Sequence, residues 1–567
     1  MSSTRRAVGG FLAAAALLVI GRAIVDWTAA GWFAEAAGVA SGASGRRALA
    51  LALRLVSGST MTLAVFASLL AVRRSIVSVV VPRQFGNLVI GEVVPSGILT
   101  LGALLVGLVA GGFAAALPPD VLTVQLGLHP LVTGEVDPYW GRDLGFYWAW
   151  LPFEHWIAGQ VGVIWLTVTL LTAFAYVLTP SVRMSRAGLR LAPWARRHLG
   201  LLLAFGVLLM GWRWRLERFD LLVADGEAFG LVAHRVQGPA LALLAWAAWP
   251  LAALLAIAAW HARVGLAGAV AIVLLVAGPV VQWLLPLSAG RQLAASERTA
   301  RDASYRAAAA RYGARQLEDS TRLFLASQPV GDGIVGPASS PTMDSPLVDV
   351  GAGRYALVED STISAVGPRF EGLPRRVVLA WAVRAPGLLR RDVAAGARIV
   401  APRDPLERLQ RIAPFLEPLG GARWLSDSFP GPRWAIDVVA TAQRFPMVGA
   451  ITLGQGEARY ARRAGVAYVD ARTGGVSIAW TSAPDPLLRA WLALDPALLR
   501  GPIALSVAEA RLWAGASAGP GASTAVTDRE AALRAVYDTL VAARRRGDGR
   551  AALEAEGRLG RLLGAVR

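Results

Sequence analysis

Seven long apolar runs in the first half of the chain limit what it can fold into. A bilayer core about 30 Å thick is crossed by about 20 apolar residues in a helix, and each run comes close to that length. They are Ala7–Val25, Ala48–Val72, Pro95–Leu117, Ile157–Leu178, His198–Trp212, Pro239–Trp260 and Val264–Pro286. We therefore predict that residues 1–286 form an α-helical membrane bundle of seven transmembrane helices. The fifth run is the shortest, and a re-entrant or strongly tilted segment is its alternative.

The composition agrees with a membrane protein and argues against binding of nucleic acid. Hydrophobic residues make up 55% of the chain and charged residues only 17%, whereas an ordinary soluble domain has roughly 25% charged residues. All 57 basic residues are arginines, and the formal net charge is +18. A nucleic-acid surface would need a basic stripe with stacking aromatics. Because the arginines of the second half are scattered among acids, no nucleic-acid partner is predicted.

The placement of arginine predicts which ends of the helices face the cytoplasm, where short connections carry an excess of basic residues. The connection Pro118–Trp156 holds one arginine and five acids. The connection after the fourth run holds Arg183, Arg186, Arg190, Arg196 and Arg197. Seven spans then place the N-terminus in the cytoplasm and everything after Pro286 outside, in a multi-pass protein of the cell membrane. A cleaved leader in place of the first span is the less favoured alternative.

The segment Asp137–Glu154, DPYWGRDLGFYWAWLPFE, is rich in aromatic residues and connects the third and fourth runs. Trp and Tyr are favoured at the membrane–water interface. Asp137-Pro138 has the form of a helix start, and Pro152 is expected to end that helix before the fourth span. We therefore predict a short helix on the outer membrane surface.

This aromatic segment is also the candidate binding surface for a ligand or partner at the outer face. The surface would be formed by Asp137, Tyr139, Trp140, Arg142, Asp143, Phe146, Tyr147, Trp148 and Trp150. Helix capping and ordinary solvation are the alternative roles of its charged residues.

An α+β extracytoplasmic domain with a helical stalk, Ser288–Glu318, is predicted for residues 287–526. Asp404 and Asp485 each precede a proline and are expected to cap helices that run to Leu416 and to about Leu494. Predicted strands are Arg354–Val358, Arg375–Arg384, Arg433–Ala440, Val466–Asp470 and Val476–Trp480, with a hairpin turn at Thr473-Gly474-Gly475. Residues 527–567 are predicted to form a C-terminal helical hairpin from Asp528–Arg546 and Gly549–Leu563.

The side chains that usually carry catalysis are sparse. The chain has no cysteine, and the last of its five histidines is His261, so the second half has neither the histidine of a serine–histidine triad nor a His/Cys zinc site of its own. Carboxylates remain, at Asp404, Glu407, Asp427 and Asp437, but nothing in their spacing pairs them. We predict no catalytic, metal-binding or cofactor-binding residues.

Several stretches resemble, in the same order, the UPF0182 family of uncharacterised bacterial membrane proteins. Besides DPYWGRDLGFYWAWLPFE, they are ARRHLGLLLAFGVLLMGWRWRLERFDLL at 195–222, GEAFGLVAH at 226–234, RDPLERLQRIAPFLEP at 403–418, WAIDVVATAQRFP at 434–446, RYARRAGVAYVDARTGGVSIAW at 459–480 and DPLLRAWLALDP at 485–496. The resemblance implies seven membrane helices, a large extracytoplasmic domain and no established activity. The family's outer domain is longer, so this chain looks like a shortened member.

The favoured function is that of a non-enzymatic cell-envelope protein that presents an extracytoplasmic binding or scaffold domain. Its expected partners are membrane lipids and an envelope protein or a cell-wall or lipid ligand. One alternative is transport or handling of a lipid or other hydrophobic solute through the seven-helix bundle. A less favoured alternative is a carboxylate-dependent envelope glycan enzyme, which needs two acids roughly 5–10 Å apart. The sequence predicts no oligomeric state.

Overall fold

The structure is a computed structural model. It describes residues 21–22, 24–38, 40–77, 83–85, 88–90, 96–129, 131–179, 181–185, 188–223, 229–292, 295–316, 347–350, 353–359, 363–425, 432–453, 456–481, 484–499, 539 and 551.

Five helices in the described part of the chain are long and apolar enough to cross a membrane. They are α2 (Ala40–Val77), α3 (Ser96–Ala116), α5 (Leu151–Val177), α6 (Pro193–Val223) and α7 (Gly238–Trp260). Each contains most or all of one predicted apolar run. The fifth run is not a short or re-entrant segment, because α6 is a 31-residue helix that continues past the apolar run through its arginines.

The other two predicted spans are not confirmed. The first, Ala7–Val25, lies almost wholly outside the described residues. The seventh is divided into α8 (Val264–Pro279), a π-helical turn η3 (Val280–Leu284) and α9 (Leu285–Gln292). Proline lacks a backbone N–H, so Pro279 interrupts regular α-helical hydrogen bonding at this point.

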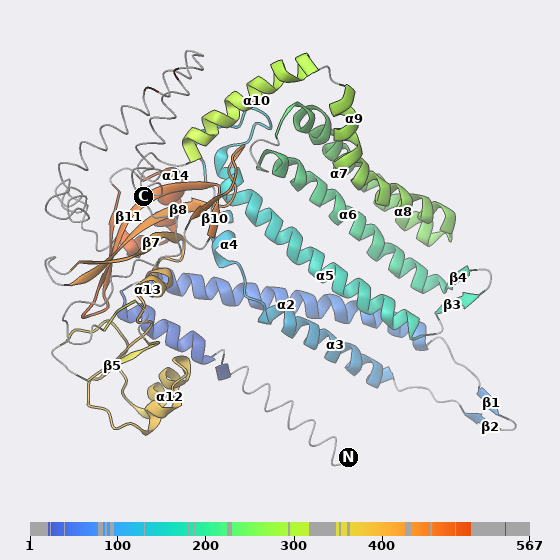
Figure 1. The fold of residues 1–567 in the computed structure, drawn as a ribbon. Helices are drawn as coiled ribbons and strands as arrows, with labels where there is room; N and C mark the ends of the chain where they lie inside the picture. The colour runs from blue at the N-terminus through green and yellow to red at the C-terminus, as the bar shows by residue number, and fades with distance from the viewer. Residues whose placement is uncertain are drawn as a thin grey trace.

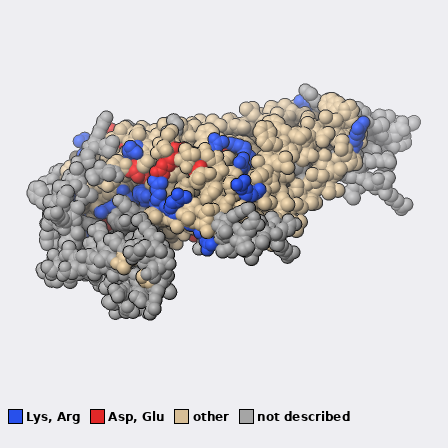
Figure 2. All heavy atoms as spheres, turned by 90° about the horizontal axis from the view of Figure 1, so that it is seen from above, with Lys and Arg blue, Asp and Glu red and all other residues tan. Residues whose placement is uncertain are grey.

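The long helices run side by side, with a domain of strands and short helices at one end (Figure 1). We call residues 347–499 the sheet domain. Two small hairpins lie at the opposite end, β1–β2 (Arg83–Phe85 and Leu88–Ile90) and β3–β4 (Val182–Ser185 and Gly188–Leu191). Figure 2 shows charged side chains gathered toward the sheet-domain end, and a largely uncharged stretch between them and a few arginines at the far end.

A small polar cluster lies among the packed helices near the end of α5 and the start of α6. The Oγ of Ser68 lies 2.5 Å from Oγ1 of Thr172 and 3.2 Å from Nε2 of His198. The hydroxyl of Tyr176 lies 3.1 Å from Nδ1 of the same histidine. Polar side chains within a helical membrane bundle are expected to pair with one another in this way.

The sheet domain is organised on a four-stranded antiparallel sheet in the order β12-β11-β8-β7. The strands are β7 (Leu416–Leu425), β8 (Arg433–Ala442), β11 (Tyr460–Asp470) and β12 (Val476–Trp480). Buried residues run almost continuously along β8, as expected for a central strand covered on both faces. The predictions of β8, β12, the end of β11 and the hairpin turn before β12 are confirmed, whereas β7 was not predicted.

The remaining strands of the sheet domain form two antiparallel pairs. Strand β5 (Ala356–Val358) pairs with β6 (Arg398–Val400), and β9 (Ile451–Leu453) pairs with β10 (Gly456–Ala458). The prediction of a strand at Arg375–Arg384 is wrong, because this segment lies largely in helix α12 (Leu373–Ala382). Its β-branched residues favour a strand. Helical packing buries Leu379 and Ala380 on one face and decides the outcome.

Both predicted helix caps are confirmed. Asp404 accepts hydrogen bonds from the backbone N–H groups of Leu406 and Glu407 and begins α13 (Pro405–Ile412). Asp485 accepts from the N–H of Leu488 and begins α14 (Pro486–Leu494). Helix α13 ends before the predicted Leu416, since that residue already starts β7. Two 3₁₀ helices, η4 (Pro386–Arg390) and η5 (Pro496–Leu499), follow α12 and α14.

The predicted stalk Ser288–Glu318 is two helices rather than one: the end of α9, and α10 (Ala295–Gln316), which runs back to the sheet domain (Figure 1). The predicted C-terminal hairpin, Asp528–Arg546 and Gly549–Leu563, lies outside the described residues except for positions 539 and 551.

We expect Gly465→Ala to destabilise the sheet domain by about 1–3 kcal/mol, the usual cost of a strained backbone conformation. Gly465 lies beside the bulge in β11 with φ +153°, and a Cβ there would overlap the carbonyl oxygen of Ala479 on β12. The measurement is the thermal unfolding midpoint of the purified chain. Gly449→Ala is the control, because a Cβ at Gly449 meets nothing within 4 Å. Equal midpoints for the two variants would contradict the expectation.

Candidate functional site

Asp137, expected to start a helix, instead holds a closed turn. Its Oδ1 accepts hydrogen bonds from the backbone N–H groups of Tyr139 (2.9 Å) and Trp140 (2.6 Å). Its Oδ2 accepts from the N–H of Arg142 (2.7 Å) and the hydroxyl of Tyr147 (2.9 Å). The residue is 1% exposed. The prediction of a helix start is wrong because the chain turns back at Gly141 (φ +65°) and the Arg142 carbonyl accepts from the Asp137 N–H (2.8 Å), so no helical turn follows the cap-like bonds.

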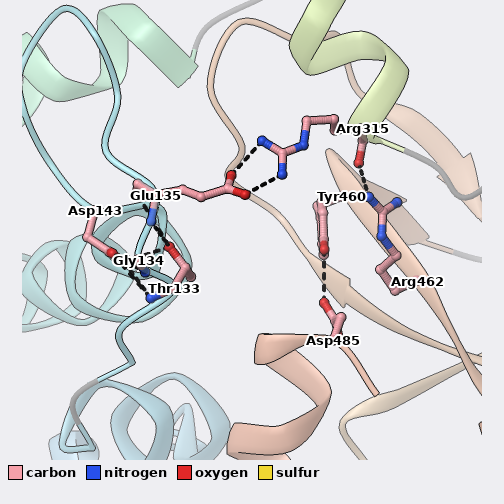
Figure 3. Close-up of polar contacts among 8 residues, drawn as sticks. All are labelled: Thr133, Gly134, Glu135, Asp143, Arg315, Tyr460, Arg462 and Asp485. Atoms are coloured by element: carbon pink, nitrogen blue, oxygen red, sulfur yellow. Dashed lines mark hydrogen bonds and ion pairs between the residues drawn. The ribbon is translucent and has the colours of Figure 1, made fainter. Parts of the chain in front are cut away.

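Asp143 holds the other side of the same loop. Its carboxylate accepts hydrogen bonds from the backbone N–H groups of Thr133 and Gly134 and from the Thr133 hydroxyl (Figure 3), and also from the N–H of Gly145. Burial alone would raise the pKa of Asp143, but these hydrogen bonds outweigh it and hold the pKa below its ordinary value. Both carboxylates in the candidate surface therefore have structural partners.

The aromatic residues after the loop do not form a separate surface helix. Phe146–Trp150 is a π-helical turn, η1, that continues directly into α5. The prediction that Pro152 breaks the helix is wrong, since this proline falls in the first turn of α5, where its missing N–H is tolerated next to the π-helical turn.

These aromatic side chains are largely buried rather than spread on a membrane surface. Tyr147 is fully buried and Trp148 is 6% exposed, while Trp150 remains 47% exposed. The indole of Trp148 packs on the sheet domain, with ring centroids 6.1 Å from Phe445 and 4.6 Å from Tyr460. Phe146 and Trp148 thus lie in or against one hydrophobic core that extends from the helices into the sheet.

Tyr139 and Trp140 belong to a neighbouring aromatic group that includes Phe229, His234 and Tyr305 of α10. The Tyr139 ring lies 5.0 Å from Phe229 and 5.3 Å from Tyr305, and the Trp140 ring lies 5.3 Å from His234. Burial, reinforced by Tyr305 and Asp137, raises the pKa of Tyr139. This group packs the loop against η2 (Ala233–Gln237) and α10.

Polar contacts reinforce the same boundary. Arg444 of the sheet domain pairs with Asp220 of α6, and the N–H of Met447 donates to the carbonyl of Leu222 (2.7 Å). Arg315 of α10 pairs with Glu135, and this hydrogen bond raises the pKa of Arg315.

A contact with strand β11 also ties α10 to the sheet, because the guanidinium of Arg462 donates a hydrogen bond to the backbone carbonyl of Arg315 (2.6 Å; Figure 3). We call the contact region formed by residues 133–154, 219–223, 229–234, 305–316, 444–453 and 456–460 the junction. Seven of the nine predicted surface residues lie buried or partly buried in it, and Arg142 and Trp150 are exposed.

A second candidate site is a cavity of about 980 Å³ between the helices and the sheet domain. Its walls come from segment 22–37, the start of α2, the start of α4 (Val121–Gly127) and the region around α13. Seven arginines but only three acids line this arginine cavity. It was not identified from sequence. The available signal was the motif RDPLERLQRIAPFLEP, because its Arg408 and Arg411 lie in the wall.

Arg408 is 5% exposed, and its hydrogen-bond partners among the described residues are all backbone carbonyls. It donates to Gly474 (2.5 Å), Pro402 (2.9 Å) and Val366 (2.7 Å). Burial, together with the nearby charge of Arg411, lowers the pKa of Arg408 to about 10. A cation that is buried among neutral carbonyls lacks a counter-charge, so the cavity wall favours an anion.

Of the four carboxylates considered for catalysis, two have structural partners, one lines the arginine cavity and one lies outside the described residues. Asp437 is buried and pairs with Arg423 (2.6 Å) and, more loosely, Arg463 (3.8 Å). Asp404 caps α13, Glu407 lines the arginine cavity, and Asp427 lies outside the described residues. Over the part of the chain that the structure describes, no group of three or more His, Asp or Glu side chains could hold a metal ion.

Comparison with known proteins finds relatives but no solved structure that matches. A family model described as "Uncharacterised protein family (UPF0182)" matches residues 7–311 and 358–506. A UPF0182 protein of Synechococcus sp. (strain JA-3-3Ab) is 36% identical over 140 residues, which are 24% of this chain and 16% of the relative. A UPF0182 protein of Micrococcus luteus is 33% identical over 158 residues, 24% of this chain and 14% of the relative. The match therefore spans only a small part of these relatives. No solved structure matches the chain.

We expect Asp137→Asn to destabilise the chain by about 1–3 kcal/mol, the cost of unsatisfied buried hydrogen-bonding groups. Each carboxylate oxygen of Asp137 accepts two hydrogen bonds. The substitution replaces one of these oxygens with an NH₂ group, which cannot accept them. Asp120→Asn is the control, because Asp120 caps α4 through one bond to the Thr123 N–H and asparagine caps a helix equally well. If both variants unfolded at the wild-type temperature, Asp137 would not hold the loop.

Proposed function

This chain belongs to the uncharacterised protein family UPF0182, and on that premise we propose that it is a non-enzymatic membrane protein that holds its sheet domain as a scaffold on the outer face of the cell membrane. The observation that carries the proposal is the packing of Trp148. This residue is part of the helix that becomes α5, yet its indole packs against Phe445 and Tyr460 of the sheet domain. A domain on a free tether would not share a buried core with a membrane helix.

The junction has the composition of a permanent contact rather than a transient one. Its centre is aromatic and buried, and ion pairs such as Arg444–Asp220 lie around it. Interfaces between domains that move freely are usually smaller and more polar. The junction therefore supports a scaffold whose position relative to the membrane helices is fixed.

Arginine placement supports an extracytoplasmic sheet domain. The far end of the helices carries Arg83, Arg183, Arg190 and Arg263, in the two hairpins and the turn between α7 and α8. Basic residues favour the cytoplasmic side. The sheet domain lies at the other end (Figure 1).

The favoured alternative is lipid handling. The arginine cavity supports it, because the cavity lies beside the ends of α2 and α3 rather than on the free surface of the sheet domain.

The chain contains no cysteine, so single cysteines report on sidedness without background. In intact cells we expect a membrane-impermeant maleimide to label Gly449→Cys in the sheet domain. It should label His261→Cys, at the far end of α7, only after the membrane is permeabilised. Both positions are exposed. The reverse pattern would place the sheet domain in the cytoplasm and overturn the proposal.

A short bis-maleimide should link Asp220→Cys to Arg444→Cys in native membranes, because these side chains meet at the junction. The control pair, Asp220→Cys with Arg391→Cys, uses an exposed arginine outside the junction on the same domain. The measurement is the yield of the internally linked chain, read as a peptide pair by mass spectrometry. Comparable yields for the two pairs would show a freely swinging domain and contradict the scaffold.

A further inference from the structure

The arginine cavity lies near the ends of two candidate membrane spans. Arg46 and Arg47 lie within the first residues of the apolar stretch Gly42–Arg73, and Asp120 follows closely after the stretch Gly97–Ala116. The ends of membrane helices lie among lipid headgroups, outside the hydrocarbon core. The positive wall of the cavity is therefore in reach of phosphate groups in the leaflet that the sheet domain faces.

Five of the seven arginines that line the cavity form no ion pair with a carboxylate in the described part of the chain. Arg46 and Arg22 are the exceptions, since Arg46 pairs with Asp495 at 2.5 Å and Arg22 pairs with Asp26 at 2.8 Å. Arg47 donates to the carbonyls of Trp27 and Ala43, as Arg408 does to three others. Within the described residues, Arg47, Arg408 and Arg411 form no ion pair. Carbonyl groups orient these guanidinium groups but do not neutralise them, which an anion would do.

Arg411 has hydrogen-bond donors left for such an anion. It uses one amino group, Nη1, on the carbonyl of Ala401 (3.1 Å). Its Nε and Nη2 donate to no described residue. The guanidinium lies over the ring of Phe33, 5.4 Å from the centroid, which fixes its position. A guanidinium with two free donors on one edge fits the oxygens of a phosphate bidentately.

Two more arginines stand at the edge of the same cavity. Arg354 and Arg384 are exposed, line the cavity and form no ion pair within the described residues. They add to the positive field at its opening, and such a field draws anions toward the site.

Exposed leucines lead away from the arginines along α2, on a face that also carries exposed Arg54. Arg47, Leu51 and Leu55 are spaced four residues apart, so they lie on one face of the helix. Leu51 is 44% and Leu55 61% exposed. A ligand with both an anionic group and an apolar chain would cover the arginines and this face together, whereas a soluble anion would cover only the arginines.

We propose that the arginine cavity binds the phosphate group of an anionic phospholipid, whose acyl chains lie along the exposed leucines of α2. The site goes beyond the scaffold function and does not depend on which side of the membrane the sheet domain occupies. Arg411 and Arg47 bind the phosphate, Arg408 supplies buried positive charge behind them, and Arg354 and Arg384 attract the headgroup.

The test uses the full chain, purified and stripped of lipid in an uncharged detergent. Binding is measured for three probes: phosphatidylglycerol, zwitterionic phosphatidylcholine, and soluble glycerol phosphate. We expect phosphatidylglycerol to bind most tightly. An arginine near an anionic lipid contributes about fivefold in affinity, so Arg47→Gln/Arg411→Gln should weaken phosphatidylglycerol binding by about 30-fold. The control Arg390→Gln/Arg391→Gln removes two exposed arginines outside the cavity and should leave the affinity unchanged.

Each result decides the proposal. Equal binding of phosphatidylglycerol and phosphatidylcholine, or equal loss in the control variant, would overturn it. Tight binding of glycerol phosphate would retain the anion site but reject the lipid as its occupant. If the double variant unfolds at a lower temperature than wild type, the single variant Arg384→Gln replaces it. Arg384 is exposed at the opening, so its loss should weaken phosphatidylglycerol binding about fivefold without changing stability.

Discussion

Trp148 belongs to two parts of the molecule at once. Its backbone is in the helical turn that begins the candidate span α5, and its indole is in the core of the sheet domain against Phe445 and Tyr460. A residue in this position fixes the sheet domain at the end of α5. The connecting loop must then close over a short path, and Asp137 and Asp143 hold it there by accepting backbone N–H bonds. The ion pairs Arg444–Asp220 and Arg315–Glu135 form because the same packing brings these elements together.

Five of the seven predicted apolar helices are present in the described part of the chain, and they were predictable because their signals are local. An apolar run of sufficient length specifies a helix in a membrane whatever the rest of the chain does. Helix caps are equally local, and Asp404 and Asp485 act as predicted. Helix α12 was mistaken for a strand because Val377 and Val378 favour β structure locally, while its true state depends on burying Leu379 in a separate core. Strand β7 was missed because Gly420 and Gly421 weaken its pattern and only pairing with β8 defines it.

The surroundings of the candidate site could not be predicted from local sequence. An aromatic segment at a membrane interface and an aromatic segment in a buried contact have the same composition. Which of the two occurs depends on residues some 300 positions away, Phe445 and Tyr460, and no local pattern in residues 137–154 reveals them. The arginine cavity was hidden for the same reason. Arg47 and Arg411 come from opposite halves of the chain, and only the folded arrangement brings them to one cavity.

Three π-helical turns in the described residues lie toward the end that bears the sheet domain: Phe146–Trp150 leads into α5, Ala233–Gln237 leads into α7, and Val280–Leu284 separates α8 from α9. A π turn contains one more residue than an α turn, and one residue of an α-helix corresponds to about 100° of rotation. Side chains on either side of the turn are therefore out of phase with the ordinary helical repeat. The rotation of each long helix about its own axis is thereby separated from the direction in which the residues at its end point. Substitutions can then change one without changing the other.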